Sequence, residues 1–308
     1  MLGVLEGFAT IGVIVALGWL LAHFGVLDRS AQDLLSKLAF FVASPALLIV
    51  IMGRTPISAI LSANLVASFA SVAVTAGVYV AISRWRWRPP LGETVIGSLC
   101  AAYVNAGNLG IPIALFVLGD ISLIAPTLLM QLLVLTPIAM ALLDADARGE
   151  RPRLLVSMRR ALANPITLGA LVGVLASFVH DRIPDVVMTP VELVGNMAVP
   201  AMLIAFGISL RTGPRFGTGG SGPHVGTIVA LKLVLQPASA VAVGYLLVGL
   251  RGHALFAAAV TAALPTAQNV FTYANRYQRG LLLARDTIFL STFLSVPVIL
   301  LIALLFKS

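Results

Sequence analysis

Residues Asn105 to Pro112 read Asn-Ala-Gly-Asn-Leu-Gly-Ile-Pro and lie inside an apolar run that extends from about residue 93 to 118. Two amides, two glycines and a proline within this segment do not suit a continuous lipid-facing helix, because glycine permits an open backbone and proline lacks a backbone donor. A second segment of the same kind, Leu264 to Asn269 (Leu-Pro-Thr-Ala-Gln-Asn), interrupts the apolar run from about 254 to 275. The sequence therefore predicts two helices that are broken inside a membrane.

The composition is that of an integral membrane protein. Of the 308 residues, 59% are hydrophobic and 10% are charged, and the mean hydropathy is +1.02. Soluble domains hold about 25% charged residues, so the composition excludes a soluble enzyme, a nucleic-acid-binding module and a disordered tail protein. The net charge of +8 comes from short loops between apolar runs. Because the basic residues form no single stripe, we predict a lipid bilayer and no nucleic acid as partner.

Ten apolar runs are candidate membrane spans, since one crossing takes about 20 residues. They lie at about residues 5–25, 33–53, 58–82, 93–118, 121–143, 163–180, 187–209, 226–249, 254–275 and 284–306. Lys and Arg collect in cytoplasmic loops. With the N-terminus outside, the ten spans put 15 basic residues on the inner side and 4 on the outer side. This asymmetry predicts an external N-terminus and a cytoplasmic central loop.

The chain repeats itself at about half its length. Pro45 begins Pro-Ala-Leu-Leu-Ile-Val, and Pro200 begins Pro-Ala-Met-Leu-Ile-Ala 155 residues later. Pro112 and Pro265, each preceded by Ala-Ala in its run, are 153 residues apart. Each half then holds five spans, and an odd number inverts the second copy in the membrane. We therefore predict an all-α polytopic membrane protein with a first five-helix repeat at 1–143, a connecting loop at 144–162 and a second, inverted repeat at 163–308.

Interrupted helices at matching places in two repeats indicate a transporter's binding site. If Pro112 and Pro265 each begin a second half-helix, the positive ends of two helix dipoles meet near the bilayer centre and favour an anion. Neither segment contains an acidic residue, which argues against a proton relay or an aspartate-based sodium site. The alternative is a pair of kinked helices whose amides only complete the backbone hydrogen bonding. The candidate substrate-binding residues in the two segments are Asn105, Gly107, Asn108, Gly110, Pro112, Pro265, Thr266, Gln268 and Asn269.

Lys232 is a basic residue inside a predicted span, about 10 Å from its inner end at the rise of an α-helix. A buried ammonium is costly in lipid. Three interpretations are open: the side chain reaches toward the inner surface, it caps the C-terminus of a half-helix, or it senses substrate charge. With Pro45 and Pro200 it forms our set of structural or coupling candidates. The single cysteine and the scattered histidines lack the spacing of a metal site, so we expect neither a metal nor a cofactor.

The whole chain resembles the auxin efflux carrier family, which includes plant auxin exporters and bacterial carriers of malonate or related organic acids. The elements that carry this resemblance are Asn105 to Pro112, Asn164-Pro165, Pro200 to Leu210, Leu231-Lys232-Leu233, Pro265 and Ser291 to Ser295. The resemblance implies ten helices in two inverted repeats, with crossed, broken helices 4 and 9 that house the substrate. It also implies a scaffold of helices 1, 2, 6 and 7, often dimeric, and a moving transport unit of helices 3 to 5 and 8 to 10.

The resemblance also assigns residues by position. It implies that Asn105, Asn108, Pro112, Pro265 and Asn269 line the site and that Gln131 lies beside the substrate. Plant members carry charged residues in the third helix, whereas residues 61–83 here contain none, so the coupling of the plant proteins does not transfer.

We therefore predict a secondary transporter and no enzyme. It moves a small organic anion, auxin-like or malonate-like, by alternating access in a bacterial inner membrane. The alternatives are a sodium-coupled organic-anion symporter of the bile-acid type and a membrane-embedded sensor or channel.

Overall fold

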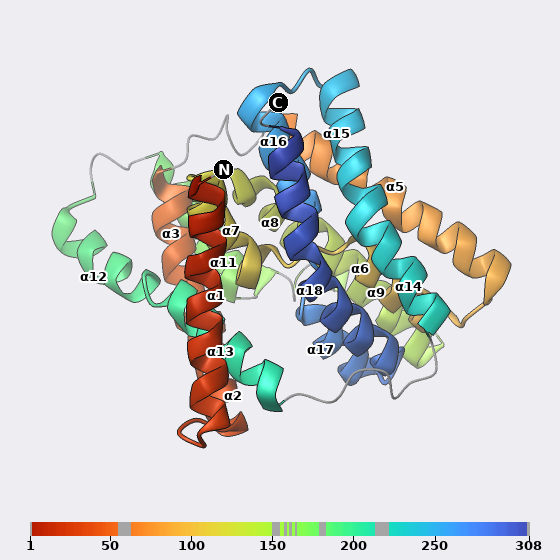
Figure 1. Ribbon diagram of the computed structural model, residues 1–308, viewed down its shortest axis with the longest axis horizontal. Helices are drawn as coiled ribbons and strands as arrows, with labels where there is room; N and C mark the ends of the chain where they lie inside the picture. The colour runs from red at the N-terminus through yellow and green to blue at the C-terminus, as the bar shows by residue number, and fades with distance from the viewer. Residues whose placement is uncertain are drawn as a thin grey trace. The chain divides into compact units, whose positions relative to one another are not determined.

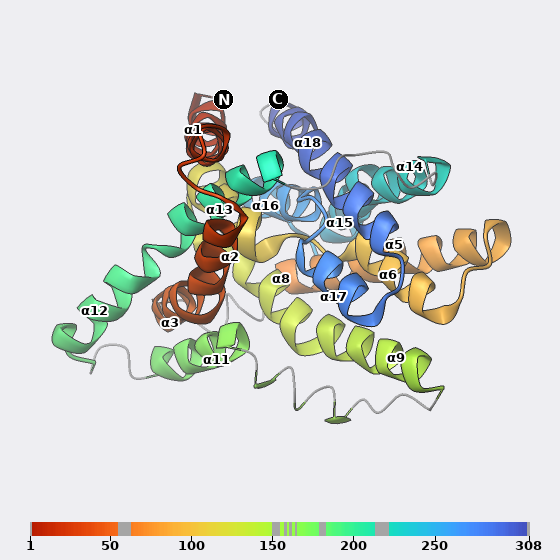
Figure 2. The same ribbon diagram turned by 90° about the horizontal axis from the view of Figure 1, so that it is seen from below.

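The computed structural model of this chain describes residues 2–54, 63–149, 155–156, 159, 162–163, 165–178, 183–212 and 222–306. Within these ranges the regular structure is helical, apart from one isolated β-bridge (Figures 1 and 2), which confirms the predicted all-α class. The helices of the first half are α1 (Leu2–His23), α2 (Arg29–Leu38), η1 (Ala39–Ala43), α3 (Ser44–Arg54), α5 (Ala63–Arg86), α6 (Leu91–Ala102), η2 (Ala106–Gly110), α7 (Ile111–Ile113), η3 (Ala114–Leu118), η4 (Ile121–Ile124), α8 (Ala125–Met130), η5 (Gln131–Leu135) and α9 (Thr136–Arg148). Those of the second half are α11 (Pro165–Ser177), α12 (Asp185–Gly195), α13 (Ala198–Thr212), α14 (Gly222–Ala230), η7 (Leu231–Leu235), α15 (Gln236–Leu246), α16 (Gly252–Ala262), α17 (Asn269–Tyr277) and α18 (Leu281–Leu305).

Six helical runs among the described residues are long and apolar enough to cross a membrane. They are Arg29–Arg54, Ala63–Arg86, Ile121–Arg148, Asp185–Thr212, Gly222–Leu246 and Leu281–Leu305, and they overlap the predicted spans 2, 3, 5, 7, 8 and 10. The predicted spans 1 and 6 correspond to shorter apolar helices, Ala9–His23 and Pro165–Ser177. The predicted spans 4 and 9 are each divided between two helices. The count of ten crossings therefore stays a prediction.

Several helical runs pass through a proline without ending, because a π-helical turn precedes it. The turns η1, η2, η5 and η7 end two residues before Pro45, Pro112, Pro137 and Pro237. Proline has no N–H to donate, and its ring clashes with the carbonyl one turn earlier. A π-helical turn is wider and moves the hydrogen bond of that carbonyl by one residue. A proline in this chain is therefore not by itself the end of a helix.

The chain packs into two compact units. The first unit comprises Met1–Leu61, Gly107–Ala125 and Leu162–Pro214, and the second comprises Ser62–Ala106, Pro126–Ala161 and Arg215–Ser308. Each unit takes segments from both halves of the chain, so these units are distinct from the predicted sequence repeats, which stay a prediction. Much of the predicted connecting loop lies outside the described residues, although α9 continues into it as far as Arg148.

Glycines let the helices of the first unit pack backbone to backbone. The helices α3 and α11 lie side by side (Figure 2), and α11 presents Gly169 and Gly173 to α3. A Cβ added at Gly169 would lie 2.6 Å from the backbone of Pro45, and one at Gly173 would lie 2.7 Å from the carbonyl oxygen of Leu48. A Cβ at Gly18 of α1 would likewise collide with the backbone of α13. Small residues four positions apart, such as Gly169 and Gly173, are typical of closely packed helix pairs in membranes.

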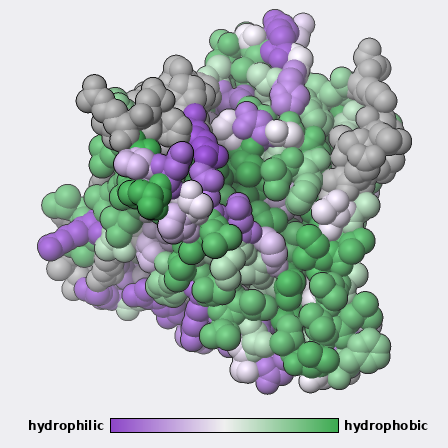
Figure 3. Space-filling view, turned by 90° about the vertical axis from the view of Figure 1, so that its left-hand side faces the viewer, coloured by the Kyte–Doolittle hydropathy of each residue, from purple (hydrophilic) through white to green (hydrophobic). Residues whose placement is uncertain are grey.

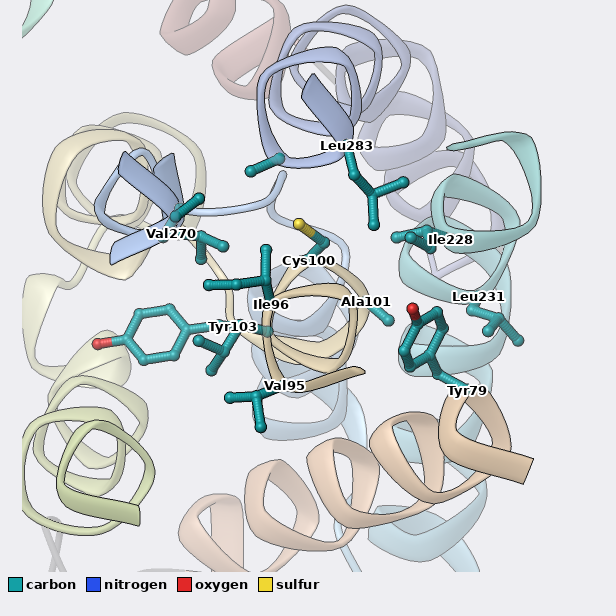
Figure 4. Close-up of a cluster of buried hydrophobic side chains, with 14 of the residues drawn as sticks. Tyr79, Val95, Ile96, Cys100, Ala101, Tyr103, Ile228, Leu231, Val270 and Leu283 are labelled. Atoms are coloured by element: carbon teal, nitrogen blue, oxygen red, sulfur yellow. The ribbon is translucent and has the colours of Figure 1, made fainter. Parts of the chain in front are cut away.

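The core of the second unit surrounds α6. Figure 4 shows Ile96 and Cys100 of α6 among side chains of neighbouring helices, including Tyr79 of α5 and Leu283 of α18. The fully buried ring of Tyr79 fits against α6 because residue 97 is glycine, and a Cβ at Gly97 would collide with the Tyr79 hydroxyl. This close packing fixes α6 in the unit, and α6 leads directly into the first predicted break.

Large hydrophobic side chains are exposed on helices of both units. Leu175 of α11 and Leu246 of α15 are two of them, and Figure 3 shows hydrophobic residues over much of the face that it presents. Extended exposed apolar surface is rare on soluble monomers. Such side chains contact lipid when the protein is in a bilayer, which agrees with the apolar composition.

Candidate functional site

Two interruptions of helices are paired with each other in the second unit. The first interruption follows α6, and the second separates α16 from α17. Val104 and Thr266 form an antiparallel β-bridge between them. The flanking hydrogen bonds run from Asn105 N to Pro265 O over 2.8 Å and from Ala267 N to Tyr103 O over 3.0 Å. Backbone groups that leave a helix inside a membrane need partners from the protein, and here each interruption supplies partners to the other.

The second interruption lies in the predicted segment Leu264–Asn269, whereas the first covers Tyr103 to Asn105 and so includes only the first residue of the predicted segment Asn105–Pro112. The prolines of the two segments do not begin the helices that follow. Pro112 is near the start of the short helix α7, inside a helical run that begins at Ala106. The π-helical turn η2 removes the conflict between the proline ring and the preceding turn, so the chain is already helical before Pro112. Pro265 lies in the extended segment, and α17 begins only at Asn269. The condition that both Pro112 and Pro265 open second half-helices is therefore not met.

Side chains from elsewhere in the second unit bind the C-terminal end of α6. The hydroxyl of Thr266 donates to Cys100 O over 2.6 Å, and Nε2 of Gln236 donates to Ala102 O over 2.9 Å. The backbone N–H of Thr266 donates in turn to Ser291 Oγ of α18 over 3.1 Å. The last carbonyls of a helix have no intrahelical partner, so these bonds satisfy acceptors that would otherwise be buried alone. The Thr266 hydroxyl, predicted to face substrate, is bound to the backbone in this structure.

Lys232 caps the C-terminal end of α16. Its side chain is fully buried, and Nζ donates to Gln236 Oε1 over 2.6 Å and to the carbonyl oxygen of Ala262 over 2.9 Å. Ala262 is the last residue of α16. The C-terminal end of a helix carries about half a negative charge, which an ammonium group stabilises. Of the three interpretations of Lys232, capping of a half-helix is the one that the structure shows.

Lys232 and Gln236 act as one element, which we call the Lys232–Gln236 pair. Lys232 binds the end of α16, Gln236 binds the end of α6, and the two side chains bind each other. They are four residues apart, on one face of a continuous helical run. Gln236 was not among the predicted site residues, and no partner was predicted for Ser291. The spacing from a lysine within a span is the signal that could have indicated Gln236.

Gln131 binds the backbone of the first interruption. Its buried side chain donates from Nε2 to Val104 O over 2.9 Å. The family resemblance implies that this amide lies beside the substrate. In the structure it is hydrogen-bonded to Val104, the residue before Asn105. Next to it, the hydroxyls of Tyr103 and Thr136 are hydrogen-bonded at 3.0 Å. Polar side chains therefore hold the first interruption on several sides.

The predicted site residues divide between the two units. The second unit contains Asn105, Gln131, Lys232, Pro265, Thr266, Gln268 and Asn269, and the first contains Pro45, Gly107, Asn108, Gly110, Pro112 and Pro200. Asn105 is buried beside the paired interruptions, whereas Gln268 and Asn269 are half-buried where α17 begins. The second unit therefore combines three neutral amides with the N-terminal end of α17. We call Asn105, Gln268 and Asn269 the amide group.

The amide group offers a ligand hydrogen bonds from neutral side chains. Among the residues that the structure describes, no group of three or more His, Cys, Asp or Glu side chains could hold a metal ion. The paired segments carry amides and hydroxyls and no acidic residue. Amides offer both donors and acceptors, and a helix N-terminus attracts negative charge.

Helices with exposed apolar faces, two of them interrupted and joined at polar segments, are typical of polytopic membrane transporters. The chain belongs to the auxin efflux carrier family: the family described as "Membrane transport protein" matches residues 4–303. The resemblance found in the sequence is thereby confirmed.

Two relatives cover nearly the whole chain. A protein of Rhizobium meliloti (strain 1021) named "Putative malonate transporter" is 27% identical over 296 residues, which are 93% of this chain and 90% of the relative. A protein of Methanothermobacter thermautotrophicus (strain Delta H) named "Uncharacterized transporter" is 26% identical over 299 residues, which are 96% of each chain.

Proposed function

We propose that this chain is a secondary carrier that moves a small organic anion by alternating access. The observation that carries the proposal is the pairing of the two interruptions through Val104 and Thr266. This pairing brings Asn105 within one backbone hydrogen bond of Pro265, and Gln268 and Asn269 follow shortly along the chain. Broken helices with polar segments are where transporters bind their substrates.

The substrate class follows from the charge of the groups present. The amide group can hydrogen-bond a carboxylate, and the N-terminal end of α17 adds a partial positive charge. No carboxylate in either segment would repel an anion. The name of the Rhizobium meliloti relative supports a dicarboxylate such as malonate as the first substrate to test. For an anion that leaves a cell with a negative interior, about 2.3 kcal/mol per charge is available at 100 mV, so export needs no second ion.

The proposal includes the architecture predicted from the sequence. It comprises ten spans in two inverted five-helix repeats, with helices 4 and 9 broken and crossed, an external N-terminus and a cytoplasmic central loop in a bacterial inner membrane. The composition of the two units supports a division of labour. The first unit contains predicted spans 1, 2, 6 and 7, which the family resemblance assigns to a scaffold that is often dimeric, and the second contains spans 3, 5, 8, 9 and 10.

Counterflow in proteoliposomes tests the proposal. Purified protein in liposomes that contain unlabelled malonate should accumulate labelled malonate, saturably and against its gradient, which a channel or sensor would not do. Asn105→Ala and Asn269→Ala should each lower the apparent affinity by about 10-fold or more, since a hydrogen bond to a charged group contributes about 1.5–3 kcal/mol. Asn196→Ala is the matched control, because Asn196 is an exposed amide at the end of α12.

A wider anion panel, including auxin-like aromatic acids, makes the test independent of malonate. If both amide variants fold and carry every transported anion as well as the parent does, the amide group is not the binding site. If no anion in the panel shows counterflow, the carrier proposal itself fails.

A further inference from the structure

The Lys232–Gln236 pair differs from an ordinary buried ion pair because the partner of the cation is a neutral amide and not a carboxylate. The two acceptors of the Lys232 ammonium are a backbone carbonyl and an amide oxygen, at 2.9 Å and 2.6 Å. Both acceptors are neutral, and among the described residues Lys232 has no carboxylate partner. A fully buried positive charge without a counter-ion is costly. In the described structure the amide oxygen of Gln236 and the partial negative charge at the C-terminal end of α16 compensate this charge.

A free cation would find suitable ligands at the same place. In transporters with interrupted helices, unwound backbone carbonyls and half-helix C-terminal ends coordinate the coupling cation. Ala262 O belongs to the last residue of α16, next to the interruption, and Gln236 supplies a side-chain oxygen. These are the neutral oxygen ligands that a small alkali cation prefers. In this chain the ammonium of Lys232 is bound to them.

We infer that Lys232 is a tethered cation: its ammonium takes the place that an exchangeable coupling cation would occupy at the end of α16. The paired interruptions are then held together without sodium, and removal of the Lys232 side chain opens the place to a small cation from solution. Only the consequence for ion coupling rests on the proposed transport function. The binding of a cation by the variant does not depend on what the protein transports.

Thermal unfolding of purified full-length protein in detergent tests the inference. The parent should have the same Tm in sodium, lithium, methylammonium and choline chloride at equal ionic strength. Lys232→Ala should have a lower Tm in choline, and sodium, lithium or methylammonium should raise it. A cation at about ten times its Kd should raise Tm by about 2 °C in a protein of this size.

Two control variants separate a cation site from a general salt effect. Lys232→Met removes the charge but fills most of the space, so added cations should not restore its Tm. Lys37→Ala removes an exposed ammonium from α2 and should behave as the parent. The inference is overturned if folded Lys232→Ala gives the same Tm in all four salts, or if Lys232→Met responds as Lys232→Ala does. If Lys232→Ala cannot be purified, a sodium-specific rise in the Tm of the parent still refutes it.

Transport gives a second, separate measurement. Counterflow by the parent should be equal in sodium and choline, and counterflow by Lys232→Ala should become dependent on sodium or methylammonium. Sodium-dependent counterflow by the parent would refute the tethered cation while leaving the anion carrier intact. Absence of any counterflow would refute the proposed function while leaving the Tm result valid.

Discussion

Replacement of Gln236 by leucine should disconnect the two helix ends that the Lys232–Gln236 pair joins. The amide of Gln236 makes two buried hydrogen bonds, one from Nε2 to Ala102 O and one from Lys232 Nζ to Oε1. Leucine makes neither bond. It leaves the carbonyl of Ala102 without this donor, and it leaves the ammonium of Lys232 with one of its two acceptors.

The expected cost is large because both groups are buried. An unsatisfied buried carbonyl costs about 1–3 kcal/mol, and a hydrogen bond to a charged group contributes about 1.5–3 kcal/mol. We expect Gln236→Leu to lower the free energy of unfolding by about 3–5 kcal/mol, which is also the range for removal of one partner of a buried charged pair. Replacement of both partners removes the stranded charge as well. The double variant Lys232→Met/Gln236→Leu should therefore be less destabilised than the sum of the two single variants, by about 1 kcal/mol or more.

Unfolding in mixed micelles, followed by circular dichroism, measures these free energies. Ser239→Ala is the matched control on the same helix, because the half-buried Ser239 hydroxyl only donates to a carbonyl one turn earlier. Its effect should be about 0.5 kcal/mol or less. If Gln236→Leu is no more destabilising than Ser239→Ala, or if the double variant equals the sum of the single variants, the two side chains do not act as one element.

Three further predictions concern the packing and the caps. Thr266→Val should lower the free energy of unfolding by about 1–3 kcal/mol, because it removes the buried donor to the Cys100 carbonyl. Thr261→Val should be neutral or stabilising, since the Thr261 hydroxyl is buried with no partner among the described residues. Equal effects of the two changes in the mixed-micelle titration would contradict this assignment. Gly173→Ala should destabilise by about 1–3 kcal/mol through overpacking, while Gly12→Ala, whose added Cβ meets nothing within 4 Å, should not destabilise at all; the reverse order in the same titration would refute the close packing of α11. Hydrogen bonds from the Ser30 hydroxyl and the Ala31 N–H lower the pKa of Asp28 below its usual 3.8. The stabilisation of α2 by this cap should therefore be complete above about pH 4 and be lost as the pH falls through the lowered pKa. Hydrogen exchange of the backbone amides in the first turn of α2 should become faster at low pH in the parent and not in Asp28→Asn. The same pH dependence in both proteins would refute the role of Asp28 as a charged cap.

The sequence predicted the two interruptions because their cause is local. Glycine, proline and amide residues inside an apolar run indicate an interrupted helix, and α16 ends just before the segment Leu264–Asn269. The end of α6 at Ala102 comes three residues before Asn105, and the glycines and the proline of Asn105–Pro112 lie in a helical run that begins at Ala106. The exact start of the next helix was less predictable. Pro112 lies inside a helical run because a π-helical turn precedes it, and a hydrogen-bond shift of one residue leaves no simple mark in the sequence.

The partners of the buried polar side chains could not be predicted from the sequence. Lys232 was recognisable as a buried cation, but its acceptor at Ala262 is 30 residues away and the Gln236 acceptor at Ala102 is 134 residues away. Such pairs depend on which helix ends meet in the folded unit. For the same reason, the hydrogen bond from the Gln131 amide to the Val104 carbonyl could not be predicted.

The long separation between Gln236 and the end of α6 also has a consequence for synthesis. The carbonyl of Ala102 leaves the ribosome well before its donor, Gln236, which comes 134 residues later. The carbonyl of Cys100 likewise precedes its donor, the Thr266 hydroxyl, by 166 residues. During that interval the exposed carbonyls must find water or the insertion machinery, because lipid offers no donors. A polypeptide truncated in the connecting loop would keep α6 and lose all three of Lys232, Gln236 and Thr266. We expect such a fragment to be retained by the insertion machinery or degraded, and the second unit to mature only after its last helix has entered the bilayer.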